Sequence, residues 1–151
     1  MNSPYKDDIE QAKHRVDAWW NHEAIDRAVL QVRAPRKSPV VQAEISDEMS
    51  PEEVEAWFLD PEQVIPRSNR YLEDTYFGGE AFPVMFPVMG RMVAITAAYL
   101  GCPLEFLNTE TVWAHPAIDD WENRPTFRFD AGNKWWQKSE RLLKAAVKQA
   151  N

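Results

Sequence analysis

The spacing of apolar residues predicts an amphipathic helix at each end of the chain. Apolar side chains recur at helical spacing over residues 5–20, after a Ser3-Pro4 pair of the kind that opens helices. The same spacing recurs over residues 135–146, and Asn133 stands where a cap is expected. Each of these helices is expected to bury one face.

Two further helix starts lie in the middle of the chain. Ser50 and Glu53 have the spacing of a capping box around Pro51. A second helix opens at Asp60, and Pro66 inside it predicts a kink or a restart. Helices and connections therefore alternate over residues 50–72.

Short segments rich in branched and aromatic residues predict strands between the helices. The predicted strands are 28–33, 104–107, 111–115 and 126–129. Residues 82–88 contain two prolines, so they form an edge strand or an extended loop. Residues 89–100 predict a helix that ends at Gly101, where a left-handed residue is favoured.

Composition points to one globular domain. The chain has 151 residues, of which 44% are hydrophobic and 27% charged. A net charge of −7 argues against nucleic acid and anionic membranes as partners. The polar N-terminus, the single Cys102 and the lack of an apolar run near 20 residues favour a cytoplasmic protein.

The sequence predicts no metal site. His14 and His22 lie about 12 Å apart along one helix, too far to share an ion. His115 and Cys102 have no partner at metal-ligand spacing.

Two other groupings suggest ligand contacts. Residues 115–122 place an imidazole, three carboxylates and the indole of Trp121 in one loop, which suits a polyhydroxylated ligand or acid–base chemistry. The alternative is a structural loop in which an aspartate caps a turn and Trp121 fills the core. Arg33 and Arg36, at the end of the first strand, have the chemistry to clamp carboxylates, although such a pair is usually a solvated surface feature.

The stretch from Phe77 to Trp136 resembles the N-terminal half of proteins in the uroporphyrinogen decarboxylase superfamily. It reads FGGEAFPVMFPVMGRMVAITAAYLG and then VWAHPAIDDWENRPTFRFDAGNKWW. The resemblance implies an α/β chain, the N-terminal part of a (β/α)₈ TIM-barrel-like fold with a helical extension. Residues 1–151 would form one partial domain, with the extension at 1–26 and the first barrel strands and helices at 27–151. Such a barrel needs about 250 residues, so it would be incomplete.

The resemblance also implies site residues. In the family's decarboxylases, arginines after the first strand hold substrate carboxylates, and Arg33 and Arg36 stand at the corresponding place. The family's Phe-Ser-Asp segment, which supplies a catalytic aspartate, is matched loosely at Phe77–Glu80, so Glu80 becomes the candidate catalytic residue. Trp113 and His115 are further candidates for substrate contact. A shorter Arg–Arg spacing and a missing glycine argue against haem-pathway decarboxylation and leave the methyltransferase-like and uncharacterised branches open.

The expected function is therefore part of a decarboxylase (a lyase) or corrinoid-linked methyltransferase that acts on a small carboxylated or methylated molecule. The chain would be inactive alone, and a second chain or a second copy would complete the barrel. Zinc or a corrinoid would belong to the complete enzyme, since the family's zinc ligands lie in the C-terminal half of the barrel. One alternative is a stand-alone small-ligand or sugar-binding module that stacks its ligand on Trp113, Trp121, Trp135 or Trp136. Another is a degenerate relative kept for an interaction.

Overall fold

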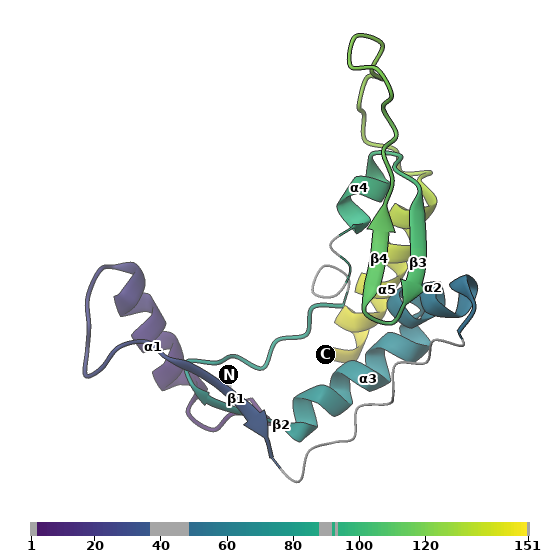
Figure 1. Cartoon of the computed structure of the whole chain (residues 1–151). Helices are drawn as coiled ribbons and strands as arrows, with labels where there is room; N and C mark the ends of the chain where they lie inside the picture. Colours follow the sequence, from purple (N-terminus) through teal and green to yellow (C-terminus); the bar gives the residue numbers. More distant parts are fainter. Residues whose placement is uncertain (1–2, 37–48, 88–91, 93, 151) are drawn as a thin grey trace. The chain divides into compact units, whose positions relative to one another are not determined.

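The chain is a mixture of helices and small antiparallel sheets. A computed structural model describes residues 3–36, 49–87, 92 and 94–150, and Figure 1 traces its elements. It falls into two compact units: Met1–Gln42 with Ser68–Met85, here the N-terminal unit, and Ala43–Arg67 with Phe86–Asn151, here the C-terminal unit. The α/β content expected from the sequence is confirmed. Both sheets are antiparallel pairs, whereas neighbouring strands in a (β/α)₈ barrel are parallel.

The N-terminal unit combines helix α1 (Ile9–Trp20) with strands β1 (Gln31–Pro35) and β2 (Thr75–Gly79). The two strands pair antiparallel, with Arg33 opposite Phe77. Phe77 is buried with Leu72 and Ala81 in a small apolar cluster, against which Tyr5 and Met85 pack. The burial of this cluster fixes which face of β2 points inward.

The C-terminal unit combines helices α2 (Pro51–Leu59), α4 (Ile95–Tyr99) and α5 (Lys134–Ala150) with strands β3 (Leu104–Asn108) and β4 (Thr111–Ala114). The strands form a hairpin that lies over α5 in Figure 1. Phe106 of β3 contacts Trp135 of α5, with ring centroids 5.6 Å apart. The other buried apolar side chains of this unit include Val54, Phe58, Leu59, Val64, Ile65, Met92, Ile95, Ala98 and Leu142.

The cap signals of the sequence are confirmed. The Ser50 side chain accepts a hydrogen bond from the Glu53 N–H, and the Glu53 carboxylate accepts one from the Ser50 N–H. The Asn133 side-chain oxygen accepts hydrogen bonds from the N–H groups of Trp135 and Trp136 at the start of α5. Gly101 has a φ of 96°, the left-handed conformation expected after α4.

Other sequence predictions were wrong. The first helix begins at Ile9, because Ser3 and Lys6 form a bridged turn in which the Ser3 hydroxyl accepts a hydrogen bond from the Tyr5 N–H. Helix α3 (Pro61–Asp74) continues through Pro66 without a restart.

Two strand predictions also need correction. The first strand begins three residues later and ends two residues later than expected, at Gln31–Pro35 instead of 28–33. Residues 126–129 form no strand, because no neighbouring strand pairs with them. Of the helix predicted at 89–100, residues 88–91 and 93 lie outside the described residues, and the described helical part is α4.

None of the helices in the described ranges is long and apolar enough to span a membrane.

Adjacent leucines in α5 provide a test of the C-terminal core. Leu142 is 0% exposed and Leu143 is 47% exposed. Leu142→Ala is expected to lower the free energy of unfolding by about 3 kcal/mol, because it leaves a cavity in the core. Leu143→Ala makes the same change in helix propensity and should cost less than about 1 kcal/mol. Urea denaturation followed by circular dichroism measures both values, and equal losses would contradict this packing.

Candidate functional site

The predicted site residues lie in both units. Arg33, Arg36 and Glu80 belong to the N-terminal unit, and Trp113 and His115 to the C-terminal unit. Each group is therefore described within its own unit.

A tight turn at two glycines directs the Glu80 side chain into the interior of the N-terminal unit. Gly79 has a φ of 59°, and a Cβ atom there would lie 2.1 Å from the carbonyl oxygen of Leu30. Only glycine meets both conditions. A Cβ at Gly78 would meet the Tyr76 ring at 2.8 Å. After this turn the Glu80 N–H donates to the Leu30 carbonyl at 2.9 Å, and the side chain is fully buried.

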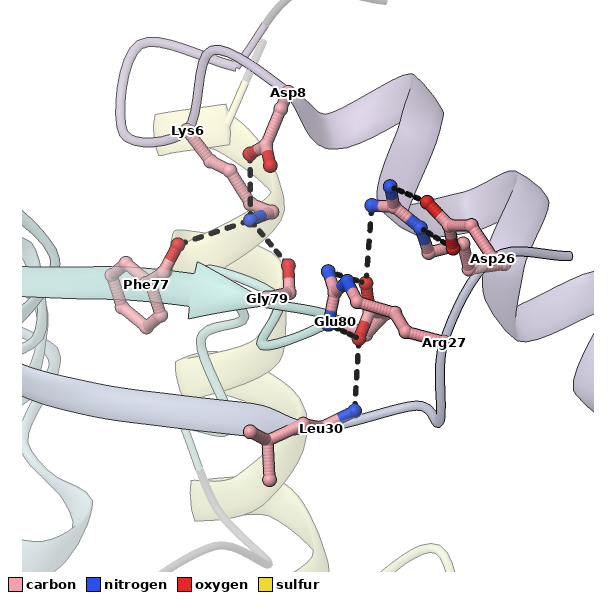
Figure 2. A network of polar contacts seen from close by, with 9 residues as sticks. Lys6, Asp8, Asp26, Arg27, Leu30, Phe77, Gly79 and Glu80 are labelled. Atoms are coloured by element: carbon pink, nitrogen blue, oxygen red, sulfur yellow. Dashed lines mark hydrogen bonds and ion pairs between the residues drawn. The ribbon is translucent and has the colours of Figure 1, made fainter. Parts of the chain in front are cut away.

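The Glu80 carboxylate is surrounded by donors (Figure 2). Arg27 donates to both of its oxygens, at 2.6 Å to Oε1 and 3.2 Å to Oε2. The Leu30 N–H donates to Oε2 at 2.9 Å, and Arg15 of α1 reaches Oε1 at 3.4 Å. Arg15 in turn makes a bidentate pair with Asp26, at 2.9 and 2.7 Å. Two guanidinium groups thus face two carboxylates, and the network is electrically balanced.

The Lys6 ammonium binds carbonyl groups of β2 on the edge that faces away from β1. Its ammonium donates to the carbonyl oxygens of Phe77 at 3.0 Å and Gly79 at 2.7 Å, and it pairs with Asp8 at 2.7 Å. Figure 2 shows the ammonium on the side of β2 that faces away from β1. Lys6 therefore satisfies strand carbonyls that a further strand would otherwise bind.

The ion network fixes the charge of Glu80. Burial alone would raise the pKa of Glu80, but the hydrogen bond from the Leu30 N–H and the charges of Arg27 and Arg15 outweigh it and hold the pKa below its ordinary value of 4.5. The hydrogen bonds from Arg15 likewise hold the pKa of Asp26 below its ordinary value. Glu80 is thus ionised at neutral pH and joins α1, the segment before β1 and the end of β2. That geometry suits positioning, and a catalytic role for Glu80 stays a prediction.

The two candidate arginines differ in their contacts. Arg36 donates through Nε to the carbonyl of Thr75 at 2.9 Å and through a terminal nitrogen to the carbonyl of Tyr5. Arg33 is exposed on β1 and makes no hydrogen bond or ion pair with any residue that the structure describes. Of the two, Arg33 is the guanidinium open to a ligand.

The hairpin of the C-terminal unit brings Trp113 and His115 together. Trp113 of β4 is paired with Glu105 of β3, so their side chains share the outer face. His115 Nε2 lies 2.7 Å from a Glu105 carboxylate oxygen, and the Trp113 indole is 58% exposed. An exposed indole therefore lies on the same face as an imidazole–carboxylate pair.

Sequence reasoning missed the charged partners of Glu80, which are Arg15 and Arg27. It also missed Asp26, which pairs with Arg15, and Lys6, which binds carbonyl groups of β2. Arg27 lies 53 residues and Arg15 65 residues from Glu80 along the chain. The one usable signal was the Gly78-Gly79 pair, because a tight turn of this kind can direct the next side chain inward. It gives no indication of which cations meet that side chain.

No group of three or more histidine, cysteine or acidic side chains in the described parts of the chain is placed to hold a metal ion. In comparisons with known proteins, the chain significantly matches no protein-family model, no curated protein and no solved structure.

The Glu80 network predicts a loss of stability in acid. Because the folded-state pKa of Glu80 lies below 4.5, the unfolded chain takes up the proton first as the pH falls. The stabilisation is therefore complete above about pH 4.5 and is lost below it. Glu80→Gln should lower the free energy of unfolding at neutral pH by about 2 kcal/mol, because the hydrogen bonds from Arg27 and the Leu30 N–H lose their charged acceptor. The variant should also lose less stability than the wild type when the pH falls below about 4.5.

The control is Glu73→Gln, which changes an exposed carboxylate of the same unit. Urea denaturation at several pH values between neutral and about 3 measures both variants. If the free energy of unfolding falls with decreasing pH as steeply in Glu80→Gln as in the wild type, the Glu80 network is not the cause of the acid sensitivity.

Proposed function

We propose that this chain is the N-terminal portion of a uroporphyrinogen decarboxylase-like (β/α)₈ barrel enzyme that acts on a small carboxylated or methylated molecule and needs a partner to be active. The observation that carries the proposal is the apolar face of the β1–β2 pair, which is exposed among the described residues of the N-terminal unit. Leu30, Val32 and Tyr76 are all exposed in this region. A pair of strands with an uncovered apolar face is marginally stable by itself, so a covering layer is expected.

The open edge of β1 supports the same proposal. β1 pairs with β2 alone among the strands that the structure describes, so its other edge is open to a further strand. A second chain or a second copy would supply it. The zinc or corrinoid of a complete enzyme would also have to be held by that partner, and we assign no contact with either group to this chain.

Arg33 is the proposed substrate contact. Its guanidinium is exposed and unpaired within the described structure, and arginine binds carboxylates through two parallel hydrogen bonds. Arg36 would support it by fixing the end of β1 to Thr75. Glu80 would act by holding this arrangement through Arg27 and Leu30.

Arg33→Gln is expected to weaken the binding of small polycarboxylates such as citrate about tenfold, the loss typical of a hydrogen bond to a charged group. Arg70→Gln, which removes another exposed charge of the same unit, should change binding less than about twofold. Amide chemical shifts along β1 report the binding. Equal affinities of the wild type and Arg33→Gln for the polycarboxylate would show that Arg33 does not contact the ligand. The need for a partner would be contradicted by an isolated monomer that is fully active in decarboxylation or methyl transfer.

A second candidate function is a stand-alone binding module for a sugar. The exposed indole of Trp113, on the face that carries the Glu105–His115 pair, favours it. Sugar rings stack on exposed indoles while carboxylate and imidazole groups hydrogen-bond their hydroxyls. This candidate requires no partner chain.

Trp113→Ala is expected to weaken the binding of a sugar about tenfold, because the stacking surface is lost. Trp20→Ala removes an exposed indole of the N-terminal unit that is not a candidate stacking residue, and it serves as the control. Titration of each protein with a panel of mono- and oligosaccharides, followed by tryptophan fluorescence, makes the comparison. A flat response of the wild-type protein across the panel would exclude this function.

A further inference from the structure

A small aromatic pocket lies within the C-terminal unit, and neither Trp113 nor His115 lines it. Its cavity of about 260 Å³ is lined by the end of α4, by residues 127–130 and by the start of α5. Tyr99 and Phe129 both meet the Trp136 ring edge-to-face, with centroids 5.6 and 5.1 Å away. This volume lies just below the range of about 300–1,000 Å³ that is typical of ligand pockets, so the pocket suits only a molecule of one or two rings.

Buried and partly buried hydrogen bonds hold two walls of this pocket. The Tyr99 hydroxyl donates to the Ser139 hydroxyl at 2.7 Å, and Ser139 donates to the Trp135 carbonyl at 2.8 Å. The Asn133 amide donates to the Ala98 carbonyl at 3.2 Å while its oxygen caps α5. The ends of α4 and α5 are therefore tied together, which fixes Tyr99 and Trp136 before any ligand binds.

The pocket lining includes one cationic side chain that makes no ion pair or hydrogen bond with the described residues. Arg128 lines the pocket and forms no ion pair or hydrogen bond with any residue in the described ranges. Asp130, the other charged group of the lining, accepts a hydrogen bond from the Gly132 N–H at 2.8 Å through one oxygen. A planar ring between the aromatic walls would leave an attached carboxylate free to reach Arg128.

We propose that this pocket binds a small aromatic carboxylate, with the ring against Trp136 and the carboxylate on Arg128. The sequence predicted a strand from the alternating Phe127, Arg128 and Phe129, and these three residues instead line the proposed binding site. The site is independent of both functions proposed above, because it uses neither Arg33 nor Trp113.

The test uses the full chain and indole-3-acetate as the probe, with indole-3-acetamide and acetate as the uncharged and ring-free comparisons. Amide chemical shifts of residues 127–136 are followed during each titration. We expect saturable shifts with indole-3-acetate and at least about fivefold weaker binding of the amide, because it lacks the charge. Arg128→Gln should weaken acid binding by the same factor and leave amide binding unchanged.

Two further variants separate the local site from a general charge effect. Arg124→Gln removes an exposed arginine of the same segment that does not line the pocket, and it should bind as the wild type does. Asp130→Asn removes the neighbouring negative charge and should bind the acid equally well or more tightly. The proposal is overturned if the wild type shows no saturable shifts, if acid and amide bind equally, or if Arg128→Gln binds the acid as the wild type does.

Discussion

The buried charge of Glu80 is the constraint on which the N-terminal unit depends. A carboxylate with no exposed surface is costly unless every oxygen is paired, and here Arg27, Arg15 and the Leu30 N–H supply the partners. These donors come from α1 and from the segment before β1, so their positions fix both against the end of β2. The apolar cluster around Phe77 is small, and the ion network therefore contributes an unusual share of the specificity of this unit.

The C-terminal unit depends on apolar packing, whereas the N-terminal unit depends on a buried ion network. Its helices and hairpin bury apolar and aromatic side chains, and its buried polar groups include the hydrogen-bonded Ser139 hydroxyl and the Trp57 indole N–H, which has no hydrogen-bond partner among the described residues. A core of this kind leaves side chains on its outer surface free for binding. Trp113 on the hairpin and Arg128 at the aromatic pocket are two such exposed side chains.

Local signals explain what the sequence could predict. The capping box at Ser50, the cap at Asn133 and the left-handed Gly101 depend on neighbours within a few residues, and all three are confirmed. Strand β2 was missed because its TYFGG sequence carries two glycines, which disfavour strands, and its pairing with β1 joins residues 40 or more positions apart. The partners of Glu80 were missed for the same reason, since a buried ion pair has no local sequence pattern.

The most direct test of this account is the titration of the Glu80 side chain itself. Carbon-13 labelling of the glutamate carboxyl groups, with Glu80→Gln used to assign the signal, gives its midpoint by NMR. The account predicts a midpoint below the ordinary value of 4.5, because the carboxylate is held by two guanidinium groups and a backbone N–H. A midpoint at or above 4.5 would mean that burial outweighs these partners, and it would contradict the network as the organising interaction of the N-terminal unit.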